Sequence, residues 1–191
     1  GAKHHAQYDH SSGFCVFNDM ALAAKLFMAA GLKPMYIDWD AHHGDGVENI
    51  LRPYRNLVTA SIHQGGIFPG TGLKNEPENG VYNWALANGD GDVEFLDAMQ
   101  EIELLADDIQ PDVILLATGA DAHHSDPLSG LNFDYPGYRA AARIVADIAN
   151  KHAKGRVLIG GAGGYQPFDH TPKVWATVVS EIYSDISNVP V

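Results

Sequence analysis

Short apolar segments alternate with helical segments along this chain, and this alternation restricts the folds open to it. After its first residue, the segment 112–118 is almost wholly apolar, as expected for a strand buried on both faces. The segment 93–109 instead carries apolar residues at helical spacing. We therefore predict an α/β fold in which a mostly parallel sheet is flanked by helices on both faces.

The expected elements follow one another without an internal repeat or a linker. Strands are predicted at 34–40, 57–63, 81–86, 112–118 and 156–160. Helices are predicted at 18–30, 48–51, 93–109, 137–152 and 171–186. The segment 64–80 is rich in Gly, Pro and Asn and is predicted to be a loop. We expect residues 1–191 to form a single domain.

Charge and cysteine content limit the partners. The net charge of −12 argues against nucleic acid or an anionic membrane surface as a partner and favours a cationic substrate. No apolar run has the length of a membrane span, and no signal peptide is visible. The lone cysteine, Cys15, cannot form an internal disulfide, which fits a reducing cytoplasm. The chain begins at Gly1 inside a His-rich motif, which suggests a piece of a longer chain.

Charged side chains collect where two predicted strands end. In YIDWDAHHGDG (36–46), extended geometry would point Asp38, Asp40 and His42 to the same side. Asp121 follows the strand 112–118 in the equivalent position. Ligands of parallel sheets bind at the carboxyl ends of the strands. We predict that Asp40, His42 and Asp121 hold a divalent ion such as Zn²⁺, with one position left for water or substrate.

A plainer interpretation of these residues stays open. An Asp and a His after a strand could cap backbone amides in a turn and bind no metal. His43 should point to the opposite face and be structural. For His123 and His124 we favour a loop near the mouth of the site over a ligand role.

Two further elements could supply a reaction. His4 and His5 are neighbours that could each take a carboxylate partner, with Asp38 and Asp45 as the spare acids, although a surface loop or a tag remnant would look the same. The glycine-rich GGAGGY (160–165) could bring the hydroxyl of Tyr165 to a substrate oxygen, or simply let its ring pack over a turn.

Phosphate binding is disfavoured. The run 160–166 does not complete the dinucleotide-binding glycine pattern, and neither it nor 68–74 has the Lys and Ser or Thr of a P-loop.

Taken together, the motifs resemble those of the histone deacetylase superfamily, which has the arginase/deacetylase fold. The matching motifs, in family order, are HHA (4–6), SGFC (12–15), YIDWDAHHGDG (36–46), SIH (61–63), FPGTG (68–72), GADAHHSDPLSG (119–130) and GGAGGY (160–165). They cover nearly the whole chain. They are more similar to bacterial acetoin-utilisation-type deacetylases and acetylpolyamine amidohydrolases than to the eukaryotic class I enzymes.

The resemblance implies a three-layer fold and a role for each matching residue. Asp40, His42 and Asp121 would bind Zn²⁺, or Fe²⁺, which the same ligands accept. His5, held by Asp45, would be the general base, and His4, held by Asp38, its companion; Tyr165 would donate to the oxyanion. Gly13, Phe14 and Phe68 would line a narrow substrate channel. A structural K⁺ or Na⁺ would lie near Asp38, Asp40, His42, Ser61 and Ile62.

The chain departs from the family pattern at two places. Ala162 stands where a glycine is usual, which could tilt Tyr165. Family members also carry a segment ahead of HHA that this sequence lacks, so the domain is expected to be partial, with an exposed sheet edge, an incomplete channel mouth and a tendency to self-associate.

The implied reaction is hydrolysis of an N-acetyl amide, in acetyl-lysine or an acetylated polyamine, to acetate and a free amine. One alternative is a catalytically incomplete metal-binding module of the same fold. Another is an arginase-like ureohydrolase with two metals, which is disfavoured because Asp45 arrives one residue later than the D-A-H-x-D pattern requires.

Overall fold

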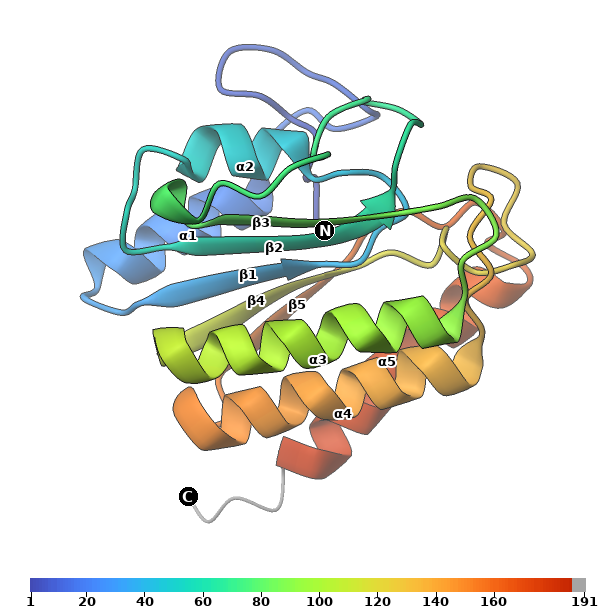
Figure 1. Ribbon diagram of the computed structural model, residues 1–191. Coiled ribbons are helices and arrows are strands. Elements are labelled where there is room, and N and C mark those ends of the chain that lie inside the picture. Colours follow the sequence, from blue (N-terminus) through green and yellow to red (C-terminus); the bar gives the residue numbers. More distant parts are fainter. Residues whose placement is uncertain (187–191) are drawn as a thin grey trace.

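In the computed structural model, which describes residues 1–186, five parallel strands form one sheet (Figure 1). The strands are β1 (Pro34–Asp38), β2 (Val58–Gln64), β3 (Val81–Leu86), β4 (Val113–Thr118) and β5 (Val157–Gly161). Their order is β3-β2-β1-β4-β5, and each neighbouring pair is parallel. All five carboxyl ends therefore lie along one edge of the sheet, and the predicted α/β class is confirmed.

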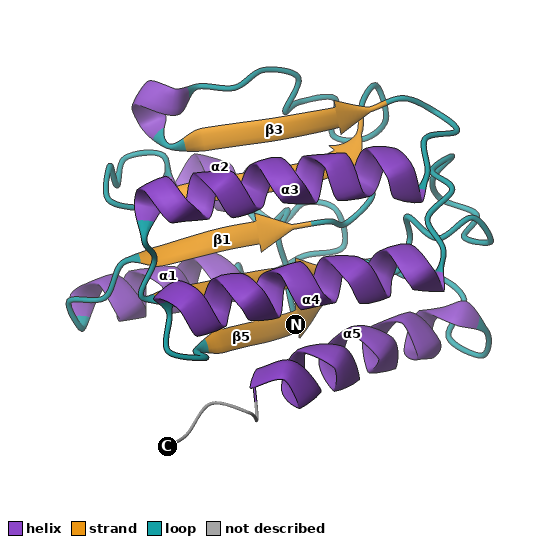
Figure 2. Cartoon of the chain, turned by 60° about the horizontal axis from the view of Figure 1, so that its bottom comes forward, coloured by secondary structure: helices purple, strands orange, loops and turns teal. Residues whose placement is uncertain are grey.

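Helices cover both faces of the sheet. They are α1 (Asp19–Ala29), α2 (Asp45–Leu51), α3 (Asp92–Ile109), α4 (Tyr135–His152) and α5 (His170–Ile186), with a short 3₁₀ helix, η1, at Pro77–Asn79. Figures 1 and 2 show α3, α4 and α5 on one face and α1 and α2 on the other. This makes the three layers that the sequence predicted.

The central strand β1 separates two apolar cores. Ile37 belongs to the larger core, under α3, α4 and α5, whereas Tyr36 belongs to the core under α1 and α2. Every residue of β1, β2 and β4 is buried. Alternate side chains of a strand point to opposite faces, so burial on both faces requires the apolar runs seen in the sequence.

The strand β1 ends at Asp38, two residues before the predicted end. The backbone N–H of Asp40 donates to Oδ1 of Asp38, and that of His42 donates to Oδ1 of Asp40, each at 2.9 Å. These side chains satisfy the backbone in place of a sheet partner and turn the chain out of the sheet. Asp38 and Asp40 therefore do accept backbone amides in a turn, as the capping interpretation expected. The same carboxylates can also bind a metal ion.

The amino-terminal loop is fastened between α1 and α2. Asn18 caps α1 by accepting the N–H of Ala21 at 2.9 Å, and its amide donates to the carbonyl of Ala6 at 2.9 Å. A Cβ at Gly46 would lie 2.4 Å from that same carbonyl oxygen, so only glycine permits this approach. Both contacts hold the two histidines of HHA at the carboxyl edge of the sheet.

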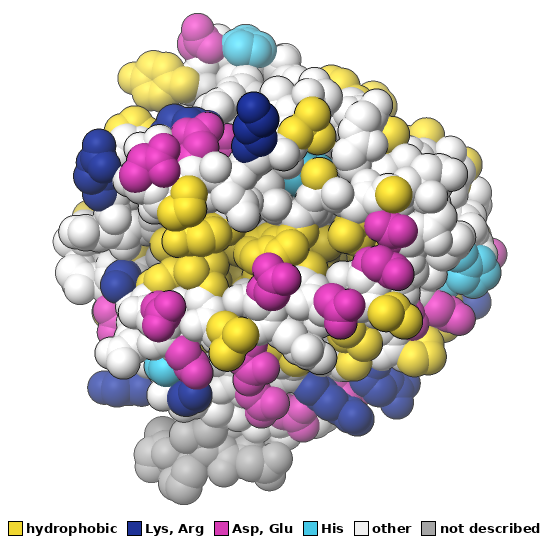
Figure 3. Space-filling view, viewed as in Figure 1, with side chains coloured by type: hydrophobic (Ala, Val, Ile, Leu, Met, Phe, Trp, Pro, Cys, Tyr) yellow, Lys and Arg dark blue, Asp and Glu magenta, His cyan; other side chains and the backbone are white. Residues whose placement is uncertain are grey.

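The outer strands β3 and β5 are less buried than the three between them. On the face shown in Figure 3, apolar side chains form a band over β3 and toward α3, bordered by acidic side chains. Tyr82 and Trp84 of β3 stack with ring centroids 6.5 Å apart. Among the described helices, none is long and apolar enough to cross a membrane.

Candidate metal centre and active site

Asp40, His42 and Asp121 meet where the loops after β1 and β4 leave the sheet. One donor atom from each lies within 4.8 Å of the others. Nδ1 of His42 is 3.1 Å from Oδ1 of Asp40 and 2.9 Å from Oδ2 of Asp121. These strands are neighbours in the sheet, which brings together residues 79 positions apart.

Two buried carboxylates and one imidazole lie together in this cluster. Asp121 is fully buried, and burial together with the nearby Asp40 carboxylate raises its pKa. Burial would lower the pKa of His42, but hydrogen bonds to Asp121 and Asp40 raise it to about 10. A positive charge is therefore favoured between the two carboxylates. Two carboxylate oxygens and one imidazole nitrogen are a donor set that suits a divalent ion.

The glycine-rich loop after β5 closes over the cluster. The N–H of Gly163 donates to Oδ2 of Asp40 at 2.5 Å. A Cβ at this position would lie 2.2 Å from Oδ2 of Asp121 and 2.7 Å from Oδ2 of Asp40. The glycine allows the backbone to approach both carboxylates.

His4 pairs with Asp38 inside the protein. Nδ1 of His4 lies 2.7 Å from Oδ2 of Asp38, which also accepts the hydroxyl of Tyr36 at 2.6 Å. Burial would lower the pKa of His4, but Asp38 and Asp40 raise it to about 10. Without a bound cation, His4 is therefore favoured in its charged form.

His5 pairs with Asp45 and has the opposite charge preference. Its Nδ1 lies 2.7 Å from Oδ1 of Asp45, while Oδ2 of Asp45 accepts the amide of Gln7 at 2.7 Å. Burial lowers the pKa of His5, and the hydrogen bond to Asp45 only partly opposes this. A neutral His5 that donates from Nδ1 keeps the lone pair of Nε2 available as a base.

Tyr165 lines the same cavity as His5 and His42. Burial, followed by the charges of Asp40 and Asp121, raises the pKa of its hydroxyl, which therefore stays protonated at neutral pH. The preceding Gly164 has a φ of +150°, and a Cβ there would meet Thr171 at 2.5 Å. The loop conformation that presents Tyr165 thus needs glycine.

A cavity of about 400 Å³ opens beside these groups. It is lined by His5, Gly13, Phe14, His42, Phe68, Leu128 and Tyr165. The ring centroid of Phe68 lies 5.1 Å from that of His5, and Phe14 lies 6.3 Å from Tyr165. The expected channel residues are therefore together. Leu128 was missed, since within GADAHHSDPLSG nothing distinguishes its side chain as a wall of the cavity.

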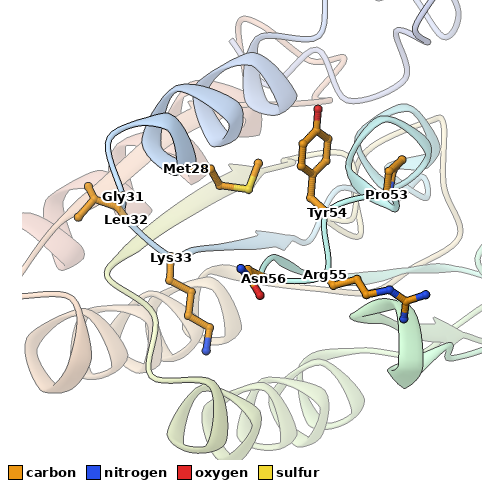
Figure 4. Close-up of a pocket in the computed structure, with 8 residues that line it drawn as sticks. All are labelled: Met28, Gly31, Leu32, Lys33, Pro53, Tyr54, Arg55 and Asn56. Carbon is orange, nitrogen blue, oxygen red and sulfur yellow. The ribbon is translucent and has the colours of Figure 1, made fainter.

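A larger cavity lies elsewhere, at the amino ends of β1 and β2 (Figure 4). Its volume is about 700 Å³, and it is lined by Met28, Gly31, Leu32, Lys33, Pro53, Tyr54, Arg55 and Asn56. It contains no cluster of metal-ligating groups. The smaller cavity, which adjoins the acids and histidines, is therefore the better candidate for chemistry.

The residues expected to hold a monovalent cation are also near one another. The pairing of β1 with β2 aligns Asp38 with Ser61, and Ile62 follows in the same strand. The hydroxyl of Ser61 is 3.0 Å from Nδ1 of His63.

The remaining histidines of the segments 36–46 and 119–130 are His43, His123 and His124, and each has a polar partner in the structure. Nε2 of His43 lies 2.9 Å from Glu48, and its Nδ1 lies 2.8 Å from the hydroxyl of Thr71. His123, His124 and Asp134 form a further cluster of donor atoms. However, Nδ1 of His123 accepts the N–H of Ser125 at 3.2 Å, and His124 and the side chain of Asp134 are exposed, so this cluster is less enclosed than the one at Asp40, His42 and Asp121.

Comparison with known proteins gives one family. A sequence model described as "Histone deacetylase domain" matches residues 1–182. The acetoin utilization protein AcuC of Bacillus subtilis (strain 168) is 35% identical over an alignment of 191 positions, which covers 95% of this chain and 49% of that protein. A probable deacetylase of Archaeoglobus fulgidus is 34% identical over an alignment of 169 positions, which covers 85% of this chain and 47% of that protein.

Solved structures agree with the fold. The HDA15 HD domain matches with a TM-score of 0.81 and 29% identity, over 97% of this chain and 54% of that one. The acetylpolyamine aminohydrolase of Burkholderia pseudomallei has the same TM-score with 23% identity, also over 97% of this chain and 54% of that one. The chain thus spans about half the length of these relatives.

Proposed function

Since the chain belongs to the histone deacetylase family, we propose that it is a metal-dependent deacetylase that hydrolyses N-acetyl amides to acetate and a free amine. The observation that carries this proposal is the convergence of three groups on one cavity. They are the acid–histidine cluster, the His5–Asp45 pair and Tyr165. Each is a component that amide hydrolysis requires.

Asp40, His42 and Asp121 would hold the metal, Zn²⁺ or Fe²⁺. When bound, such an ion polarises a carbonyl and lowers the pKa of water, to about 7 in zinc hydrolases. Two buried carboxylates with one imidazole supply the negative charge that offsets a divalent ion.

Proton transfer falls to the histidines. His5 is the general base, because its pKa is lowered and its Nδ1 is held by Asp45. It removes a proton from the attacking water through Nε2. His4 is its companion, held by Asp38. A histidine then returns a proton to the nitrogen of the leaving amine, so that it departs neutral.

Tyr165 donates a hydrogen bond to the oxygen on which negative charge develops. Its raised pKa keeps that proton in place. A hydrogen-bond donor of this kind stabilises the transition state by about 3 kcal/mol. Phe14, whose ring contacts Tyr165, and Phe68, whose ring contacts His5, both line the cavity and would exclude water from the alkyl part of the substrate.

A cationic acetylated amine, either acetyl-lysine or an acetylated polyamine, is the substrate class we propose. The net charge of −12 favours its approach. A K⁺ or Na⁺ near Asp38, Asp40, His42, Ser61 and Ile62 would support the metal-ligand loop. A cytoplasmic location and self-association through a sheet edge belong to the same proposal.

An arginase-like site with two metals is less well supported. There Asp45 would bridge to a second ion, but here both of its oxygens accept hydrogen bonds, from His5 and Gln7. Two bound metals per chain would restore that alternative.

The proposal is tested by assaying the purified chain on an acetyl-lysine peptide and on an acetylated polyamine. Acetate release should appear with added Zn²⁺, stop with a chelator, and return when metal is restored. Stoichiometric metal without acetate release would instead indicate a catalytically incomplete metal-binding module.

A further inference from the structure

Asp126 is a buried carboxylate outside the groups assigned above. Its side chain is fully buried. Its Oδ2 accepts the backbone N–H of Tyr165 at 2.8 Å and Nε2–H of His170 at 3.1 Å. Its Oδ1 accepts the backbone N–H of Leu128 at 3.1 Å. A buried carboxylate of this kind is stable because hydrogen bonds replace the water it has lost.

The donors to Asp126 come from three separate segments. Tyr165 is in the loop after β5, Leu128 is in the loop after β4, and His170 begins α5. Tyr165 and Leu128 both line the candidate active-site cavity. One carboxylate therefore connects two walls of that cavity to a helix of the larger core.

His170 has one polar contact among the described residues, and it is with Asp126. The residue is buried, and its Nδ1 has no hydrogen-bond partner within residues 1–186. One face of the ring stacks on His123 at a centroid distance of 4.5 Å and an interplanar angle of 7°. An unpaired buried nitrogen is costly, so packing alone would favour an apolar residue here.

The loop that carries Tyr165 is fixed from several sides. The carbonyl of Gly163 accepts the N–H of Ala120 at 2.6 Å, and the N–H of Gln166 donates to the hydroxyl of Thr171 at 3.1 Å. Between these points the backbone of Tyr165 is held by Asp126. A change in Asp126 would therefore alter where the chain places the Tyr165 hydroxyl.

We propose that Asp126 and His170 are positioning residues: His170 orients the Asp126 carboxylate, which in turn fixes the backbone from which Tyr165 reaches the substrate. This rests on the proposed deacetylase function, since it assigns no new reaction. Both residues act through Tyr165 and do not touch the reacting atoms. An error of about 1 Å in such a donor can reduce the rate as much as a hundredfold.

The test uses two variants that differ in where they place a donor. In His170→Gln, the side-chain amide nitrogen can take the position of Nε2 and still donate to Asp126. In His170→Asn, it takes the position of Nδ1 and cannot. Both are made in the wild-type chain and in Tyr165→Phe. The measurements are kcat, KM, bound metal, melting temperature and the hydrogen-exchange rate of the Tyr165 amide.

We expect His170→Asn to lower kcat about tenfold with little change in KM or bound metal, and to accelerate exchange of the Tyr165 amide. His170→Gln should keep at least half of the wild-type kcat and the slow exchange. In the Tyr165→Phe chain, neither substitution should lower kcat further, because the donor they position is gone.

Equal losses in both backgrounds, or unchanged exchange at Tyr165 in His170→Asn, would overturn the proposal. The exchange measurement needs no turnover, so it decides the positioning claim even if the wild-type chain releases no acetate. That last result would count against the deacetylase function alone. Should His170→Asn fail to fold, Asp126→Asn replaces it. The side-chain NH₂ of the asparagine would take the place of one carboxylate oxygen that accepts a hydrogen bond, so this variant should also accelerate exchange of the Tyr165 amide.

Discussion

Nδ1 of His5 lies 2.7 Å from Oδ1 of Asp45, a residue 40 positions further along the chain. This contact fixes the tautomer of His5 and leaves Nε2 as its basic atom. It also partly offsets the burial that lowers the pKa of His5. The basicity and the orientation of His5 thus depend on one carboxylate.

Replacing that carboxylate should weaken the base. In Asp45→Asn, we expect kcat to fall by about 10² or more, as for other histidines that lose an orienting acid. His5 must be neutral to accept a proton, so activity rises as pH increases through its pKa. Loss of Asp45 lowers this pKa further, and the acidic limb of the kcat/KM profile should move to lower pH. If the acidic limb stayed in place or moved to higher pH, Asp45 would not be the residue that raises the pKa of the general base.

The hydroxyl of Tyr165 should affect the rate and not the metal. We expect Tyr165→Phe to lower kcat by about 10² to 10³ with little change in KM and full metal content. Tyr183→Phe, at an exposed position on α5, is the matched control and should behave as the wild type. If Tyr165→Phe lost metal and activity in equal proportion, its role would be structural.

The close approach of Gly163 to both carboxylates should be necessary for metal binding. A Cβ there would overlap oxygens of Asp121 and Asp40. Gly163→Ala should therefore weaken metal affinity by about tenfold or more, measured by competition with a chelator. Gly65→Ala is the control, because its Cβ would come no closer than 3.4 Å to a neighbour. Equal affinity in the two variants would contradict this account.

Acid should destabilise the protein through Glu48. Burial would raise its pKa, but hydrogen bonds from His43, Asn83 and Arg52 lower it to about 2, from a usual value of 4.5. Because the folded-state pKa is depressed, this stabilisation is complete above pH 4.5 and is lost as pH falls toward 2.

Denaturant unfolding of Glu48→Gln tests this directly. The variant should be less stable than the wild type above pH 4.5, by roughly 2 kcal/mol after allowing for solvent screening. The difference should shrink as the pH approaches 2. Glu78→Gln, at an exposed site, should leave the curve unchanged. A Glu48→Gln difference that is constant with pH would mean that the charge of Glu48 is not the cause.

Much of the fold could be predicted because its signals are local. The continuous apolar run of β4 reflects a strand that is buried on both faces. The apolar residues at helical spacing in α3 reflect a helix that is buried on one face. The order of the strands could not be obtained this way. β4 pairs with β1 although β2 and β3 come between them in sequence, and no periodicity encodes that crossover.

The candidate site likewise contains residues that could be predicted from the sequence and residues that could not. Asp40, His42 and Asp121 could be proposed as a group because each lies at or just after the end of a predicted strand. The residues alone left open which acid serves which histidine, and only the family resemblance implied His4 with Asp38 and His5 with Asp45. Asp126 and His170 carried no signal, since their pairing depends on how α5 packs against the loop after β4.

The central claim is that a single divalent ion lies between Asp40, His42 and Asp121. Anomalous diffraction at the metal absorption edge, on crystals of the chain purified with Zn²⁺, tests it most directly. We predict one peak per chain, at about 2.0 to 2.2 Å from each of the three donor atoms. A peak elsewhere, such as beside His124, or no peak among these three residues, would contradict the proposed metal centre and the hydrolysis that depends on it.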